Sequence, residues 1–148
     1  MTPDELARRC ADVMWAQDVA SRRLGMRLES VAAGRAAVSM AVGDEMTNGH
    51  GTAHGGFIFT LADSAFAFAC NSSNDRAVAQ ACDIVFVSPV HAGDLLVAEA
   101  VERSTFGRNG IYDVQVRRGD EVVAEFRGRS RTVGGRHVDV PDTEAGDG

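Results

Sequence analysis

The sequence contains no lysine, and all fifteen of its basic residues are arginine. Schiff-base chemistry, which needs a lysine amine, is thereby excluded, and so is the phosphate-binding lysine of a P-loop. No run of about 18 uninterrupted apolar residues occurs, so we expect no membrane span. The N-terminal stretch MTPDELARRCADV carries acids and arginines where a signal peptide needs an apolar core, which predicts a cytoplasmic location.

Cysteine is scarce as well. Cys10, Cys70 and Cys82 form an odd set without a C-x-x-C spacing, which argues against a disulfide framework or a cysteine zinc site. No G-x-S-x-G nucleophile elbow is present. Cys70 has no activating charge near it in the sequence, so we interpret it as a small core residue rather than a nucleophile.

Negative charge is concentrated at the C-terminal end. The net charge of the 148 residues is −6, but residues 137–148 hold four acids and no arginine, which leaves a nearly neutral body. Such a body is a poor general binder of nucleic acid. We predict a single domain over residues 1–136, followed by an acidic, disordered tail over residues 137–148.

The hydrophobic pattern changes its period along the chain. Helical spacing predicts a helix over residues 3–23, capped by Thr2 and Pro3, and a second, very apolar helix over residues 54–72. Strand-like segments are predicted at residues 26–31, 36–42, 77–87, 94–106, 110–118 and 121–133, joined by short turns. This order favours an α+β fold in which one antiparallel sheet curls around the central helix.

The central helix carries one narrow stripe of small and polar residues, which includes Gly56, Thr60, Asp63, Ser64 and Ala67. Close helix packing would explain the small residues but not the carboxylate of Asp63. An isolated carboxylate in apolar surroundings costs several kcal/mol unless it is paired, hydrogen-bonded or protonated. The pattern identifies no basic partner, which makes Asp63 a candidate functional residue.

The start of the same helix carries His54, Gly55 and Gly56. The first N–H groups of a helix have no partner within it, so they suit a carbonyl oxygen that gains negative charge. Eight residues of helix separate Gly55 from Asp63 by about 12 Å, too far for both to act on one carbonyl. We therefore predict a dimer in which Asp63 of one copy faces Gly55 of the other across a two-fold axis.

Five segments together resemble the hotdog-fold acyl-CoA thioesterases, and within them the bacterial thioesterases of phenylacetate degradation. They are MTNGH at 46–50, HGGFIFTLADSAFAFACNS at 54–72, AGDLL at 92–96, GIYDV at 110–114 and EFRGRS at 125–130. The resemblance covers roughly residues 5–135. It implies a hotdog fold with dimers paired into a homotetramer, and hydrolysis of phenylacetyl-CoA or hydroxyphenylacetyl-CoA without a cofactor beyond the coenzyme A of the substrate.

The resemblance also implies site roles. Asp63 is the nucleophile or the general base that activates water, and the Gly55 N–H polarises the thioester carbonyl. Asn48 positions the water or the carbonyl, and His54 orients the loop or hydrogen-bonds near the carbonyl. Ser64 stands where the family often has threonine, beside the attacking group.

Arginines alternate near the end of the last predicted strand, at Arg127, Arg129 and Arg131. The pattern fits a solvated face equally well as a cradle for the phosphates of coenzyme A. The resemblance places the nucleotide near this strand, with Gly128 admitting the ligand and Arg108 as a further candidate.

Other constellations fit the sequence less well. His50 and His54 lie four residues apart, but the glycine-rich loop between them does not favour a metal site, and no third ligand is evident. A triad of Ser64, His54 and Asp63 fails because adjacent helical residues point about 100° apart. A hotdog hydratase or dehydratase, or a non-catalytic acyl-CoA-binding module, remains as an alternative function.

Overall fold

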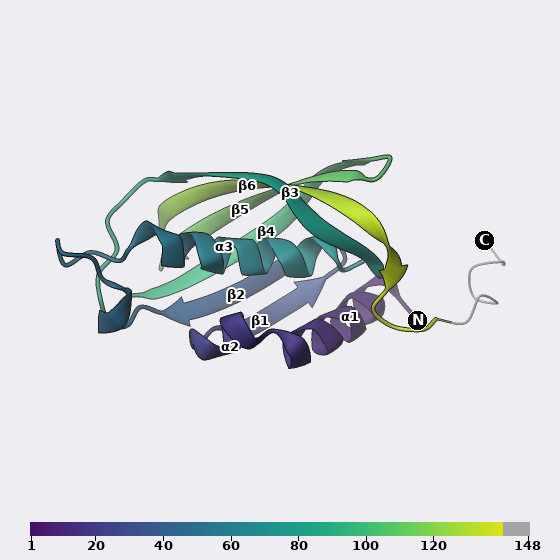
Figure 1. Ribbon diagram of the computed structural model, residues 1–148, viewed down its shortest axis with the longest axis horizontal. Coiled ribbons are helices and arrows are strands. Elements are labelled where there is room, and N and C mark those ends of the chain that lie inside the picture. Colours follow the sequence, from purple (N-terminus) through teal and green to yellow (C-terminus); the bar gives the residue numbers. More distant parts are fainter. Residues whose placement is uncertain (141–148) are drawn as a thin grey trace.

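The computed structural model describes residues 1–140 and shows one antiparallel sheet wrapped around a long helix (Figure 1). The elements are α1 Pro3–Gln17, α2 Val19–Arg23, β1 Arg27–Ala32, β2 Arg35–Ala41, η1 Asp44–Met46, α3 Gly55–Cys70, β3 Asp75–Phe86, β4 Leu95–Phe106, β5 Asn109–Arg118 and β6 Glu121–Arg136. The sheet order is β1-β2-β4-β5-β6-β3. The predicted α+β class and the curved sheet around a central helix are confirmed.

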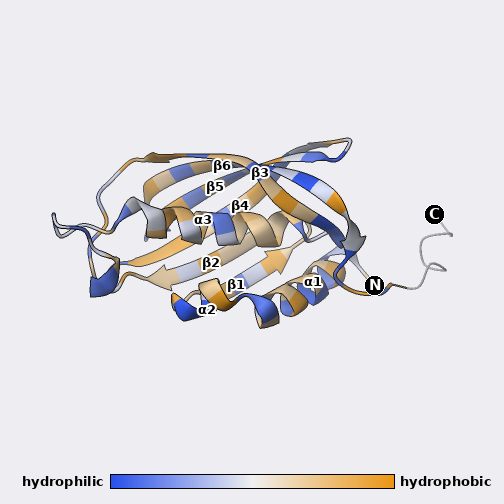
Figure 2. Cartoon of the chain, in the orientation of Figure 1, coloured by the Kyte–Doolittle hydropathy of each residue, from blue (hydrophilic) through white to orange (hydrophobic). Residues whose placement is uncertain are grey.

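The core lies between α3 and the concave face of the sheet. Figure 2 shows hydrophobic segments on α3 and on the strands behind it. The buried side chains that α3 contributes are Ile58, Leu61, Ala62, Ala65, Phe66, Phe68, Ala69 and Cys70. They meet alternate residues of the strands, such as Val38, Leu96, Val114 and Phe126. This period of two sends every second side chain of a strand to α3 and leaves the rest on the outer face.

The N-terminal segment departs from the single helix predicted over residues 3–23. Thr2 caps α1 as expected, with its hydroxyl accepting from the Glu5 N–H and the Glu5 carboxylate accepting from the Thr2 N–H. The helix ends at Gln17, however, and Asp18 starts a second helix by accepting the Ser21 N–H at 2.9 Å. An aspartate that bonds nearby backbone amides competes with a continuous helix, which is why the chain breaks here.

The last strand continues three residues beyond its predicted end at residue 133. Beyond it, the backbone N–H groups of His137 and Val138 both donate to the Asn74 side-chain oxygen at 3.0 Å. The first two residues of the predicted tail, His137 and Val138, are thus bound to the loop after α3. The remainder, residues 141–148, lies outside the described residues. Among residues 1–140, no helix is long and apolar enough to cross a membrane.

Candidate active site

The N-terminus of α3 presents a backbone amide without a partner. His54 is the N-cap, and its Nδ1 accepts the Gly56 N–H at 3.0 Å, so the ring proton of the neutral imidazole lies on Nε2. The Phe57 N–H donates to the His54 carbonyl. Within residues 1–140, the Gly55 N–H has no acceptor. The histidine cap therefore satisfies the second amide of the helix and leaves the first one free to bind a ligand oxygen.

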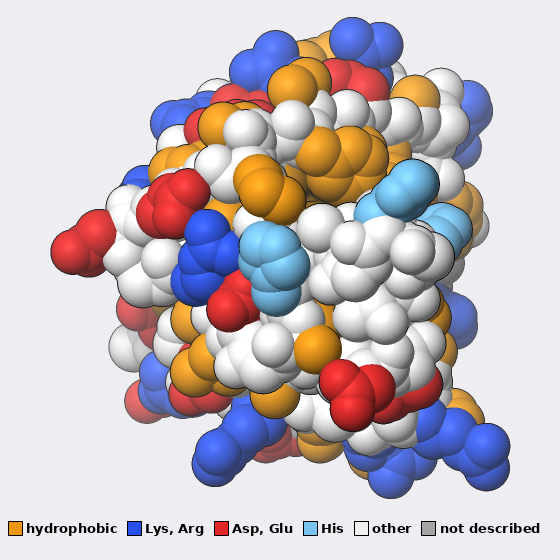
Figure 3. Space-filling model, turned by 90° about the vertical axis from the view of Figure 1, so that its left-hand side faces the viewer, with side chains coloured by type: hydrophobic (Ala, Val, Ile, Leu, Met, Phe, Trp, Pro, Cys, Tyr) orange, Lys and Arg blue, Asp and Glu red, His pale blue; other side chains and the backbone are white. Residues whose placement is uncertain are grey.

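A cleft of about 380 Å³ opens beside this amide. Gly55 lies on it together with Phe86, Val87 and Pro89 from the end of β3 and the loop that follows. A Cβ on Gly55 would lie 2.7 Å from the Phe86 ring, so the absent side chain leaves room for the half-exposed aromatic group. Figure 3 shows hydrophobic and histidine side chains gathered at this end of the molecule.

Asn48 organises the loop that leads to the helix. Its side-chain oxygen accepts the His50 N–H at 2.8 Å, and its amide nitrogen donates to the Thr52 hydroxyl at 3.0 Å. The backbone N–H of Asn48 donates to the Thr52 carbonyl at 2.8 Å. In the protomer the side chain of Asn48 therefore holds its own loop, and one amide proton remains to meet a water or a carbonyl.

Asp63 lies in the middle of α3 and is partly buried. Burial raises the pKa of its carboxyl group, and the nearby negative charge of Asp18 raises that pKa further. No arginine of residues 1–140 pairs with it or lowers its pKa. The predicted unpaired carboxylate is thus present, and its raised pKa makes it a stronger base than an exposed aspartate.

Ser64 does not hydrogen-bond Asp63 in the protomer. Its hydroxyl is buried and lies 2.8 Å from the Ser21 hydroxyl of α2, and Ser21 in turn bonds Asp18. Nothing in the sequence pattern singles out Asp18 or Ser21. Aspartate is a favoured N-cap residue, but the contact with Ser64 spans 43 residues of chain and needs the tertiary fold.

The arginines of β6 differ in their surroundings. Arg127 is exposed and binds Asp113 of β5 through two hydrogen bonds of 2.7 and 3.0 Å, while Arg103 of β4 binds the same carboxylate. Hydrogen bonding to Arg127 and Arg103 lowers the pKa of Asp113. Arg129 is also exposed, and within residues 1–140 it forms no ion pair. Arg129 is therefore better placed than Arg127 to meet a phosphate.

Gly128 and Arg108 lie in different settings. Gly128 faces the core, where a Cβ would lie 2.7 to 2.8 Å from three carbons of the Phe66 ring. This contact with α3 accounts for the glycine without any ligand. Arg108 lies in the exposed turn between β4 and β5, and its carbonyl accepts the Thr132 N–H of β6 at 2.8 Å. Its turn therefore adjoins the arginine-bearing end of β6.

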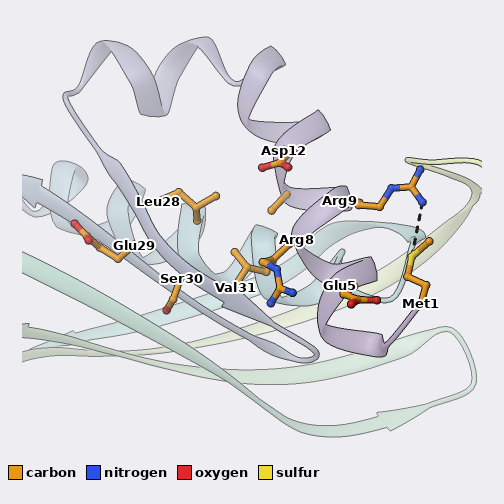
Figure 4. A pocket seen from close by; sticks show the side chains of 10 residues that line it. Met1, Glu5, Arg8, Arg9, Asp12, Leu28, Glu29, Ser30 and Val31 are labelled. Atoms are coloured by element: carbon orange, nitrogen blue, oxygen red, sulfur yellow. Dashed lines mark hydrogen bonds between the residues drawn. The ribbon is translucent and has the colours of Figure 1, made fainter.

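A hollow of about 670 Å³ lies elsewhere. Figure 4 shows it between α1 and β1, where Arg8 and Asp12 stand opposite Leu28 and Glu29. It contains none of the predicted site residues, and its charges are of mixed sign. No group of three His, Cys, Asp or Glu side chains suited to a metal ion occurs within residues 1–140. The expectation of a metal-free site stays a prediction.

A six-stranded antiparallel sheet wrapped around one apolar helix is the arrangement of the hotdog-fold thioesterases. Among residues 1–140, the helix also carries an amide at its start and a carboxylate at its middle that have no partner. Residues 50–125 match the Thioesterase superfamily. The acyl-coenzyme A thioesterase PaaI of Escherichia coli K12 is 44% identical over 126 residues, which cover 84% of this chain and 90% of that protein. The chain belongs to the Thioesterase superfamily.

Solved structures agree with this assignment. The E. coli PaaI protein from the phenylacetic acid degradation operon superposes with a TM-score of 0.89 at 41% identity, over 91% of this chain and 99% of that one. The smu.793 protein of Streptococcus mutans, solved with acetyl-CoA, gives a TM-score of 0.72 at 27% identity, over 75% of this chain and 90% of its own. The predicted family, hotdog fold and thioester-hydrolase class are confirmed.

Proposed function

We propose that this protein hydrolyses acyl-coenzyme A thioesters with a short aromatic acyl group, phenylacetyl-CoA or hydroxyphenylacetyl-CoA, and releases the free acid and coenzyme A. The E. coli relative is an acyl-CoA thioesterase from a phenylacetic acid degradation operon, and a structural relative was solved with acetyl-CoA. These relatives support the substrate class. The acyl group follows from the resemblance alone.

The proposal depends most on one observation: α3 carries a carboxylate, Asp63, and an amide, Gly55 N–H, that lie eight residues apart and have no partner within residues 1–140. The helix rise separates them by about 12 Å, so a single protomer cannot apply both to one thioester. Two antiparallel copies of α3 would bring Asp63 of each copy to Gly55 of the other and create two equivalent sites.

The surface of β3 supports such a pairing. This strand ends the sheet and pairs only with β6 within residues 1–140, so its outer edge keeps unpaired backbone groups. Val78, Val85 and Phe86 are about half exposed on it, and Val87 follows them. An apolar, unpaired edge strand favours association with a second strand. We therefore infer a homodimer joined along β3, and the resemblance extends it to a homotetramer.

In this site the Gly55 N–H of one copy binds the thioester oxygen as the carbonyl is attacked. In one route Asp63 takes a proton from water while the water oxygen attacks the carbonyl carbon. In the other route the carboxylate attacks first, forms a mixed anhydride and releases coenzyme A thiolate, and water then cleaves the anhydride. In both routes the carbon–sulfur bond breaks and the thiolate leaves with a proton. Oxygen-18 recovered in Asp63 after a single turnover in labelled water marks the anhydride route.

In this proposal, arginines on the outer face of β6 and in the neighbouring turn bind the phosphates of coenzyme A. Arg129 has no ion pair within the described chain, and Arg108 lies in the turn next to the same strand end. Both guanidinium groups would reach phosphate oxygens as bidentate donors. Arg127 contributes less because Asp113 already holds it.

A matched pair of variants tests the role of the amide. Gly55→Pro removes the N–H, while Gly55→Ala keeps it and adds the same Cβ. Proline is well tolerated at the first position of a helix, and His54 has the extended backbone, φ −64° and ψ 132°, that a following proline requires. We expect the proline variant to turn over about 10²- to 10³-fold more slowly than the alanine variant. Equal rates would remove this amide from the site.

Mixing experiments test the composite site. Asp63→Asn and Gly55→Pro proteins are each expected to be inactive toward phenylacetyl-CoA in a thiol-release assay. After denaturation, mixing and refolding, half of the dimers combine the two variants, and each mixed dimer has one intact site. Activity should return to roughly one quarter of the wild-type value. A mixture as inactive as its components would show that each subunit holds a complete site. A wild-type protein without activity on any acyl-CoA would instead favour a binding module or a hydratase.

A further inference from the structure

A chain of hydrogen bonds joins the start of α2 to the middle of α3. One carboxylate oxygen of Asp18 lies 2.6 Å from the Ser21 hydroxyl, and the other accepts the Ser21 N–H at 2.9 Å. The Ser21 hydroxyl lies 2.8 Å from that of Ser64. Ser21 and Ser64 are 2% and 8% exposed, so water does not compete for these bonds. The short helix α2 is thereby fastened to the α3 turn that carries the proposed catalytic carboxylate.

The proton positions in this chain follow from its chemistry. An ionised carboxylate only accepts hydrogen bonds, so Ser21 must donate its single hydroxyl proton to Asp18. Ser21 can then only accept from Ser64, which makes Ser64 the donor of the 2.8 Å bond. The Ser64 proton therefore points to α2. In the protomer this proton is therefore engaged with Ser21 rather than with Asp63, and the expected place of Ser64 beside the attacking group stays a prediction.

The charge of Asp18 also reaches Asp63. It is the one charged group of residues 1–140 that acts appreciably on the Asp63 carboxylate. The other titratable groups that sense Asp63 are the thiols of Cys82 on β3 and Cys70 on α3 itself. Burial raises the pKa of both thiols, that of Cys70 to about 12, so both stay neutral. Burial is the larger cause of the raised pKa of Asp63, and the negative charge of Asp18 adds to it.

We propose that Asp18 is a positioning residue for Asp63. Its carboxylate anchors the turn of α3 that carries Asp63 through the hydroxyl groups of Ser21 and Ser64. Its negative charge disfavours the ionised form of Asp63. Because the Asp63 carboxylate is destabilised in this way, it accepts a proton or attacks a carbonyl carbon more readily. This inference depends on the proposed function, in which Asp63 carries out the reaction.

Four variants separate the charge of Asp18 from its hydrogen bonds. Asp18→Asn and Asp18→Ser remove the charge, and both residues are favoured helix N-caps, so α2 is retained. Ser21→Ala keeps the charge but breaks the chain to Ser64. Asp12→Asn, on the exposed face of α1, is the control for the loss of one negative charge that takes no part in this hydrogen-bond chain.

Two measurements follow. The first is the pH dependence of kcat/KM for phenylacetyl-CoA, whose acidic limb reports the titration of Asp63. The second is a carbon-13 NMR titration of labelled aspartate carboxyl groups, in which the Asp63 signal is the one missing from Asp63→Asn. The NMR titration needs no activity, so a failure of the proposed function would not obscure it.

Both Asp18 variants are expected to move the acidic limb and the NMR midpoint of Asp63 to lower pH. The Asp12 control should leave both unchanged. Ser21→Ala should lower kcat by about tenfold or less, the effect of one lost hydrogen bond, without moving the limb. Asp18 variants whose Asp63 midpoint matches that of the wild type would overturn the inference. If the midpoint moves while wild-type and Asp63→Asn rates are equal, Asp18 acts on Asp63 but the proposed function fails.

Discussion

Replacing Asp63 by asparagine should abolish thioester hydrolysis and at the same time stabilise the fold. The two side chains have nearly the same shape, and no hydrogen bond or ion pair to the carboxylate is lost within the described chain. What changes is the charge, which is partly buried and lies near a second acid. A charge that function requires and the fold does not compensate lowers stability.

The sign follows from the raised pKa. An aspartate in the unfolded chain titrates near pH 3.9, and Asp63 titrates higher in the folded state because of burial and Asp18. Between these two values the folded state binds more protons, so stability falls as the pH rises through that window. Above it the cost is constant. The asparagine variant avoids this cost, so its advantage should be absent below about pH 4 and should grow as the pH rises through the raised pKa of Asp63.

The expected gain at neutral pH is about 0.5–2 kcal/mol, the usual range for single stabilising substitutions. For a domain of this size 1 kcal/mol corresponds to roughly 3 °C, so Tm should rise by about 2–6 °C. Thermal unfolding at pH 3.5 and pH 7.5, at one protein concentration, measures both values and keeps any subunit association constant. An asparagine variant that melts below the wild type at pH 7.5 would show that a cation or amide from another subunit stabilises the Asp63 carboxylate.

Two further predictions concern the residues assigned to coenzyme A. Gly128→Ala should destabilise the protein by about 1–3 kcal/mol because its Cβ would press on the buried Phe66 ring, while KM stays unchanged. A raised KM with an unaltered Tm would assign the glycine to ligand approach instead. Arg129→Gln should raise KM for acyl-CoA by about tenfold through loss of a charge-assisted hydrogen bond, whereas Arg127→Gln, whose guanidinium is held by Asp113, should change KM less than about twofold. Equal effects of the two arginine variants in steady-state assays would contradict this distinction.

The unpaired groups of α3 could be predicted because each depends on local chemistry. Asp63 stands out as a charge in an apolar helical segment, and Gly55 stands at a helix start, where amides lack partners. Even their separation follows from the helix rise. The curved antiparallel sheet was predictable for the same reason, since the strand pattern and the short turns each depend on residues that are neighbours in the sequence.

Contacts between distant segments could not be predicted. The alternation on β6 placed Arg127 and Arg129 on one face, but only the pairing of β5 with β6 puts Asp113 beside the first and not the second. Gly128 had the same appearance as a ligand-approach glycine until the fold placed Phe66 against it. In both cases the deciding partner comes from another element.

The sequence by itself determined the fold class, the helix that carries the site and the two groups at its start and middle, because helical period, capping and unpaired charge act over a few residues. The tertiary structure decided that Asp113 holds Arg127 rather than Arg129, why Gly128 is a glycine, and that Asp18 and Ser21 reach Ser64 beside the proposed base. These depend on the sheet register and on the way α2 packs on α3, and such long-range contacts are fixed only when the whole core assembles.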